Sequence, residues 1–430
     1  MSFSIPLLIG NLFQQLYNTV DSYVVGNYVS KQALAAVGAS TPIINMLIGF
    51  FMGLATGASV VIAQDYGSNS NGSLKKAVHS SFALTVMMSI VLTVVGVSFT
   101  NPLLHFTGVP EDVFPESSLY LKIYFAGIAF NLIYNMGAGI LRAVGDSKRP
   151  LYFLIVASLI NVVLYFLFVK YIRFGVAGAG YATLFAQAVS SLLVIYKLTH
   201  TTELYCLNIK DISFDPLITK QIIKFGLPTG IQQGIVSLSN VIVQSYVNVF
   251  GSSVMAGYSA SIRIDGFVNL PLQSFNMAIT TFVGQNIGSK NYDRVKKGSR
   301  ITLIMILSVI AIISMFLYFY GENVIAIFNS ERDVVKAGRL IQLTFIPFYI
   351  FLLITQIYSG VLKGAGKTAE PTIIMIFNFV ILRQIYLAII TKIIRSLVYV
   401  FLGWALTWIT SAIMFVIYYH KVDLMNIKKL

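Results

Sequence analysis

The sequence GAGILRAVGDSKRP at Gly137–Pro150 returns as YSGVLKGAGKTAEP at Tyr358–Pro371. The two stretches share a pattern of glycine, leucine and proline at a constant offset of 221 positions: Gly139, Leu141, Gly145 and Pro150 pair with Gly360, Leu362, Gly366 and Pro371. At the same offset, AQDYGS at Ala63–Ser68 corresponds to GQNIGS at Gly284–Ser289. Repeated loops in one register indicate a chain built from two related halves.

The composition indicates a protein that lies in a membrane. Apolar residues make up 57% of the 430 positions, charged residues only 11%, and the mean hydropathy is +0.79. A soluble domain carries roughly 25% charged residues. The apolar residues form twelve runs of about 20 residues, long enough to cross a bilayer as helices. We therefore predict an all-α polytopic membrane protein of twelve transmembrane helices in two six-helix bundles, residues 1–204 and 205–430, joined by a linker at about His200–Thr219.

The repeat and the loop charges predict the topology. Six spans per half give both halves the same orientation, so a pseudo-two-fold axis should run along the membrane normal. Lys and Arg concentrate in the even-to-odd loops, and such loops face the cytoplasm. Examples are Lys75, Lys76, Arg142, Lys148, Arg149, Lys290, Arg294, Lys296, Lys297, Arg300, Lys363 and Lys367. We expect both termini in the cytoplasm.

Several classes of function find no support in the sequence. The net charge of +14 comes from short loops, without a long basic face that could follow nucleic-acid phosphates. Cys206 is the only cysteine and the four histidines are scattered, so no metal site is predicted. No catalytic motif or phosphate-binding loop appears, which predicts no enzyme and no ATPase. Two bundles around a cleft are typical of a transporter that rocks between two openings; a non-transporting membrane scaffold is the alternative.

Polar residues cluster inside the predicted first span. Gln14, Tyr17, Asn18 and Asp21 follow the i, i+3, i+4, i+7 spacing of one helical face. Lipid would leave these groups unsatisfied, so the face should line a cavity or a hydrogen-bonded seam between helices. Asp21 is the only acidic residue well inside the first six spans, and a carboxylate there is by default a functional hypothesis.

In the second half the acidic residue well inside a predicted span is Asp265. It could form a structural ion pair with Arg263 or Arg383, or it could line a substrate cavity together with Arg263; both readings stay open at this point. Gly49, Gly53 and Gly57 repeat at four-residue spacing, which indicates close helix packing.

The chain resembles the multidrug and toxic compound extrusion family, most closely its DinF-like bacterial branch. The resemblance rests on IPLLIGNLFQQLYNTVDSYVVGNYV at Ile5–Val29, on GAGILRAVGDSKRP, and on FVGQNIGSKNYDRVKKG at Phe282–Gly298, and it covers nearly the whole chain. It implies the fold of a cation-coupled antiporter. The basic leader that commonly precedes the first span of this family does not appear here.

The resemblance also implies roles for particular residues. Asp21 matches the carboxylate used for ion coupling, Asn161 and Thr183 match its polar partners, and Tyr17 matches an aromatic neighbour. Many members carry an aspartate at the position of Tyr165, and the NorM-like branch has an acidic pair in spans seven and ten that is missing here. Gln244 takes the place of Asp21 in the second half.

The sequence therefore predicts an antiporter, monomeric and without a cofactor, that exports amphipathic cationic or zwitterionic organic compounds against an inward flow of protons or Na⁺. The proton is favoured because only one coupling carboxylate is available. Gln14, Asn18, Gln244, Arg263 and Asp265 are the candidate substrate-cavity residues. A flippase for lipid-linked precursors or polysaccharides is the second candidate; it would require more intramembrane cations than Arg263 and Arg383.

Overall fold

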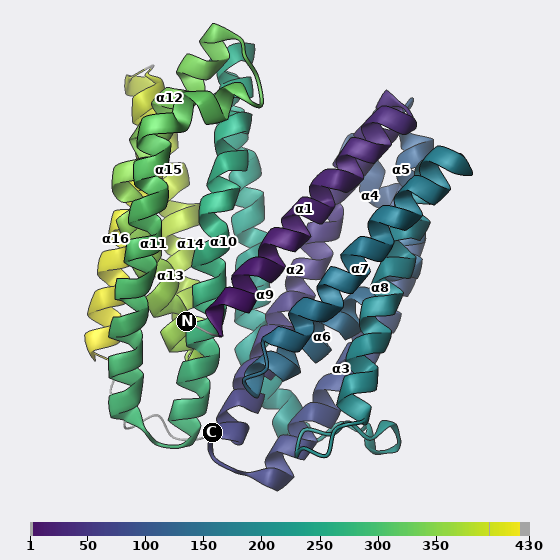
Figure 1. Cartoon of the computed structure of the whole chain (residues 1–430). Helices are drawn as coiled ribbons and strands as arrows, with labels where there is room; N and C mark the ends of the chain where they lie inside the picture. The colour runs from purple at the N-terminus through teal and green to yellow at the C-terminus, as the bar shows by residue number, and fades with distance from the viewer. Residues whose placement is uncertain (1–2, 395, 422–430) are drawn as a thin grey trace. The chain divides into compact units, whose positions relative to one another are not determined.

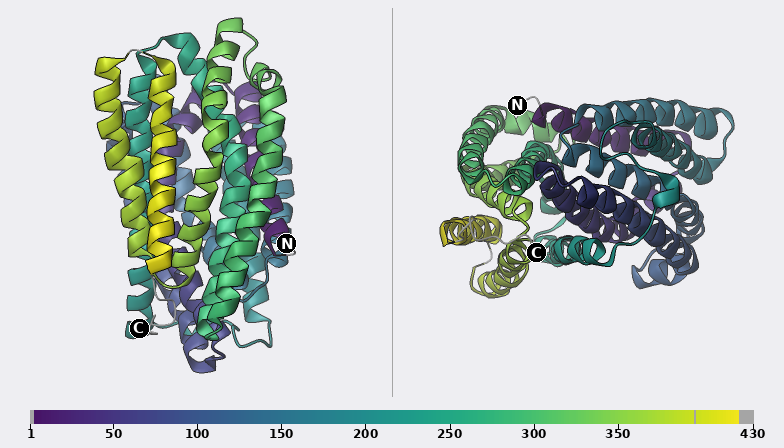
Figure 2. Two further views of the ribbon diagram at one scale, coloured as in Figure 1. Left: turned by 90° about the vertical axis from the view of Figure 1, so that its left-hand side faces the viewer. Right: turned by 90° about the horizontal axis from the view of Figure 1, so that it is seen from below.

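The computed structural model describes residues 3–394 and 396–421, and in this part every regular element is a helix (Figure 1). Within the first helices a few side chains lie outside the described part: Tyr17, Asn18, Asp21, Ser22, Tyr23, Asn27 and Lys31. The chain divides into two compact units, Met1–Gly230 and Ile231–Leu430. Each unit has its own hydrophobic core, and Figure 2 shows its helices running side by side.

The first unit contains eight α-helices, two short irregular helices and the beginning of a ninth α-helix. These are α1 (Ser4–Tyr28), α2 (Lys31–Gly67), α3 (Asn71–Ser98), α4 (Thr100–Phe106), α5 (Phe114–Ala126), α6 (Ile128–Ala143), α7 (Lys148–Tyr165), the π-helical η1 (Phe166–Tyr171), α8 (Gly175–Thr199), the 3-10 turn η2 (Ile209–Asp211) and the start of α9 (Pro216–Asn248).

The second unit begins inside α9 and continues to the end of the chain. It contains α10 (Ser252–Gly288), α11 (Tyr292–Ala326), α12 (Arg332–Phe345), the 3-10 turn η3 (Ile346–Phe348), α13 (Tyr349–Gly364), α14 (Ala369–Ile376), the π-helical η4 (Phe377–Leu382), α15 (Arg383–Ile393) and α16 (Leu397–Lys421). The two units are defined by contacts between residues, whereas the halves predicted above, 1–204 and 205–430, are defined by the sequence repeat. The predicted boundary between residues 204 and 205 therefore stays a prediction.

The described helices account for the twelve predicted spans. Eight are long and apolar enough to cross a membrane, and the pair α5 and α6, bent by 48°, makes a ninth span. Three further helices of sufficient length, α1, α9 and α10, are not among these and carry several amide and hydroxyl side chains. Polar spans of this kind are found where helices face a protein interior or an aqueous cavity. The prediction of an all-α polytopic membrane protein is confirmed.

The internal repeat is visible in the backbone of the loops. Gly145 and Gly366, which end the helices α6 and α13, both adopt positive φ, at 99° and 80°. Asn69 and Lys290, again 221 positions apart, adopt φ of 52° and 59° in the turns before α3 and α11. Left-handed backbone at a non-glycine residue is uncommon. Its occurrence at equivalent positions confirms that the two halves share one local fold.

The same offset appears in the packing. A Cβ on Gly139 of α6 would lie 2.8 Å from the Ser59 Oγ of α2, and Gly360 of α13 accepts a hydrogen bond from the Thr280 hydroxyl of α10 at 3.1 Å. Ser59 and Thr280 are also 221 positions apart. The two units therefore repeat the same helix contacts. The axis predicted to relate them remains a prediction.

Glycines bring α2 and α9 into backbone contact. A Cβ on Gly226 would lie 2.6 Å from Leu54 Cα, and a Cβ on Gly53 would collide with the Gly230 nitrogen. Gly57 faces Gly226 in the same way. Two glycines spaced four residues apart on each helix make this approach possible, so the close packing predicted for the Gly53 and Gly57 positions is confirmed.

We expect Gly226→Ala to destabilise the protein by about 1–3 kcal/mol, because the added methyl group enters a contact that has no room for it. Gly234→Ala on the same helix is the matched control. A Cβ there meets nothing within 4 Å, so it should be neutral or gain up to about 1 kcal/mol from helix propensity. Thermal unfolding of both variants in detergent tests this pair, and equal midpoints would contradict it.

The segment between α8 and α9 is fastened to α3. Lys75 binds Asp211 at 2.9 Å and Lys76 binds Asp215 at 3.1 Å. The Nε2 of the buried His79 accepts the backbone N–H of Asn208 at 3.1 Å. The hydrogen bond from Lys75 lowers the pKa of Asp211, and the backbone N–H of Ile218, followed by Lys76, lowers the pKa of Asp215. The linker thus belongs structurally to the first unit.

Candidate functional site

A polar cluster lies inside the first unit between α7 and α8. Asn161 and Tyr165 are one turn apart on α7, and both side chains are almost completely buried. The Tyr165 hydroxyl lies 3.4 Å from the Thr183 hydroxyl of α8, which is also buried. The structure therefore places Asn161 and Thr183 beside Tyr165, the residue that stands where many relatives were expected to have an aspartate.

Helix α1 packs against α7 next to this cluster. Gly10 faces Leu151 and Leu154, and the Tyr28 ring lies 6.1 Å from the Phe166 ring, so the two helices run parallel. Position 10 of α1 therefore lies beside positions 151–154, and position 28 lies beside position 166. Between these two contacts, the α1 backbone at about position 21 lies level with Asn161. The side chains of Tyr17, Asn18 and Asp21 lie outside the described residues. Their predicted roles stay predictions, supported by this register.

The second unit contains one partly buried carboxylate, Asp265, that is hydrogen-bonded to neutral side chains. Asp265 of α10 accepts hydrogen bonds from the Tyr349 hydroxyl of α13 at 2.9 Å and from the Asn269 amide at 3.1 Å. No salt bridge joins Asp265 to any cation of the described residues. A partly buried carboxylate supported only by neutral donors can attract a cation or bind a proton. Asn269, at i+4, could have been found from the sequence; Tyr349, on another helix, could not.

The ion pair considered for Asp265 is not formed with either arginine. Arg263 is exposed, and the buried Arg383 contacts only neutral groups. Its guanidinium donates to the Asn240 amide oxygen and the Thr407 hydroxyl, both at 3.3 Å. It also lies over the rings of Phe379 and Trp404, at 5.2 and 5.1 Å. Cation–π contacts and two neutral acceptors compensate part of the cost of burying this charge.

The other cavity candidates are more dispersed. Gln14 is exposed on α1. Gln244 is half-buried on α9 and donates to Asn248 within the same helix at 2.9 Å. Within the second unit, the described contacts therefore do not join Gln244 or Arg263 to Asp265. Among the described residues, no group of three or more His, Cys, Asp or Glu side chains could hold a metal ion.

Two spans widen into π-helix beside the polar groups. The segment η1 begins directly after Tyr165, and η4 contains the buried Asn378 and ends just before Arg383. Asn378 accepts a hydrogen bond from Thr410 at 2.6 Å. Segments of π-helix are rare and occur frequently at functional sites. Their position in the fifth and eleventh spans, which correspond in the repeat, marks both spans as candidates for function.

Comparison with known proteins identifies the family of this chain. The family model described as MatE matches residues 6–167 and again residues 228–390, in agreement with the repeat. The chain belongs to the MatE family. It is therefore a multi-pass membrane protein of a transporter family, and its relatives are transporters and not enzymes.

Curated relatives of this MatE chain come from bacteria. It is 29% identical over 379 residues to the probable multidrug resistance protein YoeA of Bacillus subtilis, covering 86% of this chain and 82% of the relative. It is 23% identical over 377 residues to the probable multidrug resistance protein NorM of Thermotoga maritima, covering 86% and 80%.

A solved structure shares the fold of the MatE chain across its length. The outward-facing conformation of a multidrug resistance MATE family transporter of the MOP superfamily matches with a TM-score of 0.92 at 24% identity. The match covers 100% of this chain and 96% of the other. The twelve-helix fold is thus that of the transporter family.

Proposed function

We propose that this protein is a proton-coupled antiporter that exports amphipathic organic compounds by alternating access. Asp21 would bind and release the coupling proton, with Asn161 and Thr183 as its polar surroundings. The observation that supports the proposal is the parallel register of α1 and α7, in which the α1 backbone near position 21 runs level with the buried Asn161, Tyr165 and Thr183. The relatives named as multidrug resistance proteins support export of small organic molecules.

The second unit supplies the proposed substrate contact. Asp265 has neutral donors on two sides and no described cation within 4 Å. A cationic or zwitterionic compound could approach it without displacing an ion pair. We further propose that the protein works as a monomer in the bacterial plasma membrane. Both termini would lie in the cytoplasm, because the loop charges follow the positive-inside pattern.

Removal of the Tyr349 hydroxyl tests this contact. We expect Tyr349→Phe to alter the half-saturating concentration of a cationic substrate by about tenfold or more, because loss of one hydrogen bond to a charged group is worth about 1.5–3 kcal/mol. Tyr358→Phe is the matched control; the Tyr358 ring is tilted by 48° against the Tyr419 ring, with centroids 4.7 Å apart. An unchanged half-saturating concentration in Tyr349→Phe, with the maximal rate also unchanged, would exclude Asp265 from the substrate site.

The flippase alternative has less support. A polyanionic lipid-linked substrate calls for several cations on the cavity wall, and the buried Arg383 already contacts Phe379 and Trp404. Purified protein in vesicles distinguishes the candidates. Uphill movement of a fluorescent organic cation under an imposed pH gradient supports the antiporter. Movement of a labelled lipid-linked sugar alone would support the flippase, and absence of any flux would support the scaffold.

A further inference from the structure

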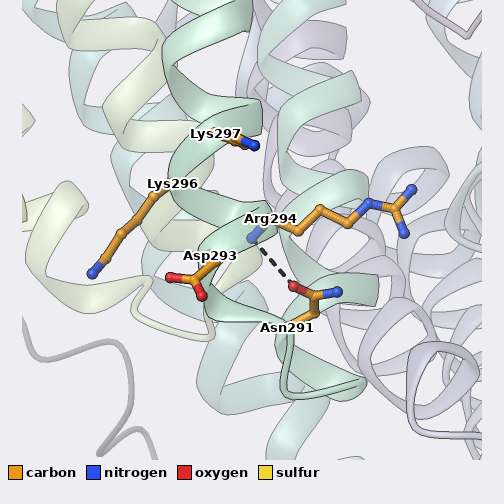
Figure 3. A pocket seen from close by; sticks show the side chains of 5 residues that line it. All are labelled: Asn291, Asp293, Arg294, Lys296 and Lys297. Atoms are coloured by element: carbon orange, nitrogen blue, oxygen red, sulfur yellow. Dashed lines mark hydrogen bonds between the residues drawn. The ribbon is translucent and has the colours of Figure 1, made fainter.

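The first turns of α11 carry a cluster of cations that the transport mechanism does not use. Arg294, Lys296 and Lys297 line an open depression of about 600 Å³ together with Asn291 and Asp293 (Figure 3). All five residues are exposed. Asn291 caps the helix by accepting the Arg294 backbone N–H at 3.2 Å. No salt bridge of the described residues involves any of these three cations.

The repeat provides an internal comparison for this cluster. Lys296 and Lys297 correspond, at the offset of 221, to Lys75 and Lys76 at the start of α3. The first pair is neutralised by Asp211 and Asp215 of the linker. Among the described residues no salt bridge neutralises Lys296 or Lys297, and Asp293 is the one acid that lines the depression. The second pair is therefore able to interact with an external anion.

The surface that continues from the cluster is apolar. Arg294, Lys297, Ile301 and Ile304 follow the i, i+3, i+7, i+10 spacing of one helical face. Ile301 is 54% exposed and Ile304 is 57% exposed. Only 17% of the apolar window of α11 is buried inside the protein, the smallest share among the eight helices that meet the span criteria. A ligand on this face would meet cations at one end and a lipid-facing apolar helix at the other.

We propose that the depression at the start of α11 binds the headgroup of an anionic phospholipid whose acyl chains lie along Ile301 and Ile304. Clusters of Lys and Arg next to a membrane span attract anionic lipids. A soluble phosphate compound would satisfy the cations but leave the apolar face without a role. A lipid fits both surfaces, because the face of α11 that carries Arg294 and Lys297 continues into Ile301 and Ile304.

Tryptophan quenching by lipids with brominated acyl chains tests the site in the full-length protein. Ile304→Trp introduces the reporter, and the parent chain, with its two native tryptophans, supplies the background to subtract. Brominated phosphatidylglycerol is compared with brominated phosphatidylcholine in otherwise identical vesicles. The test variant adds Arg294→Gln, Lys296→Gln and Lys297→Gln. The charge-matched control adds Lys148→Gln, Lys210→Gln and Lys220→Gln. These lysines are exposed and lie in α7, η2 and α9, on the same predicted side of the membrane.

We expect the reporter to bind phosphatidylglycerol about fivefold or more tightly than phosphatidylcholine, and this preference to fall with salt. The test variant should lose the preference and the control should keep it. If the test variant fails to fold, the salt dependence measured on the folded Ile304→Trp protein still tests whether charge causes the preference.

Three results would overturn the proposal. The first is an equal affinity for both lipids, and the second is a preference that survives in the test variant. The third is loss of the preference in excess inorganic phosphate but not in sodium chloride of the same ionic strength, which would indicate a site for soluble anions. If the preference emerged only after residues 422–430 were removed, the depression would instead be occupied by the chain's own C-terminal segment.

Discussion

Replacement of Asp21 by asparagine is expected to abolish ion-coupled export while membrane insertion and folding stay intact. Asparagine keeps the size and hydrogen-bonding capacity of the side chain but cannot release and rebind a proton. Asp21 is the only acid well inside the first six spans, and its backbone lies at the level of the buried Asn161. No neighbouring acid of the first unit could therefore take over the exchange.

The measurement is accumulation of a fluorescent organic cation in vesicles with an imposed pH gradient. Parent protein should concentrate the cation by about tenfold per pH unit, and Asp21→Asn should reach only the level of vesicles without protein. Asp112→Asn is the matched control, because Asp112 is an exposed acid in the loop after α4. Uphill transport at the parent rate by Asp21→Asn would show that coupling depends on another group.

Features set by local sequence could be predicted, and the structure confirms them. The constant offset that pairs Gly145 with Gly366 predicted two related halves, and both glycines adopt positive φ after equivalent helices. The spacing of Gly53 and Gly57 predicted close helix packing, which the contact with Gly226 confirms. Span number also followed from the sequence, because an apolar run of about 20 residues has few alternatives to a membrane helix.

Features set by contacts between distant residues could not be predicted. Tyr349 lies 84 positions from Asp265, and no local sequence pattern predicts the hydrogen bond between them. The sequence left an ion pair with Arg383 open, whereas Phe379, Trp404, Asn240 and Thr407 surround that arginine. The π-helical segments were also missed, because periodicity does not distinguish π-helix from α-helix over six residues. Each of these features depends on which helices pack against each other, and the sequence does not give that information.

The coupling ion is expected to be the proton and not Na⁺. A sodium ion must exchange its hydration shell for several protein oxygens, and a second carboxylate would help to offset that cost. Asp21, Asn161 and Thr183 could supply oxygens, but Tyr165, which lies 3.4 Å from Thr183, occupies the position where a second acid would be needed. A proton requires only one carboxylate that can be protonated and deprotonated in turn.

The decisive experiment separates the two gradients. Vesicles are prepared with equal pH on both sides and the membrane potential clamped at zero, so a sodium gradient is the only driving force. We expect no uphill movement of the organic cation under this condition. With a pH difference instead, exchange of one proton for one monovalent cation is electroneutral, and accumulation should follow the pH difference at about tenfold per unit. A neutral substrate would add the electrical contribution, about 2.3 kcal/mol per 100 mV. Uphill transport driven by sodium alone would instead require that oxygens around Asp21 replace the hydration shell without a second acid, and would overturn the assignment of the proton.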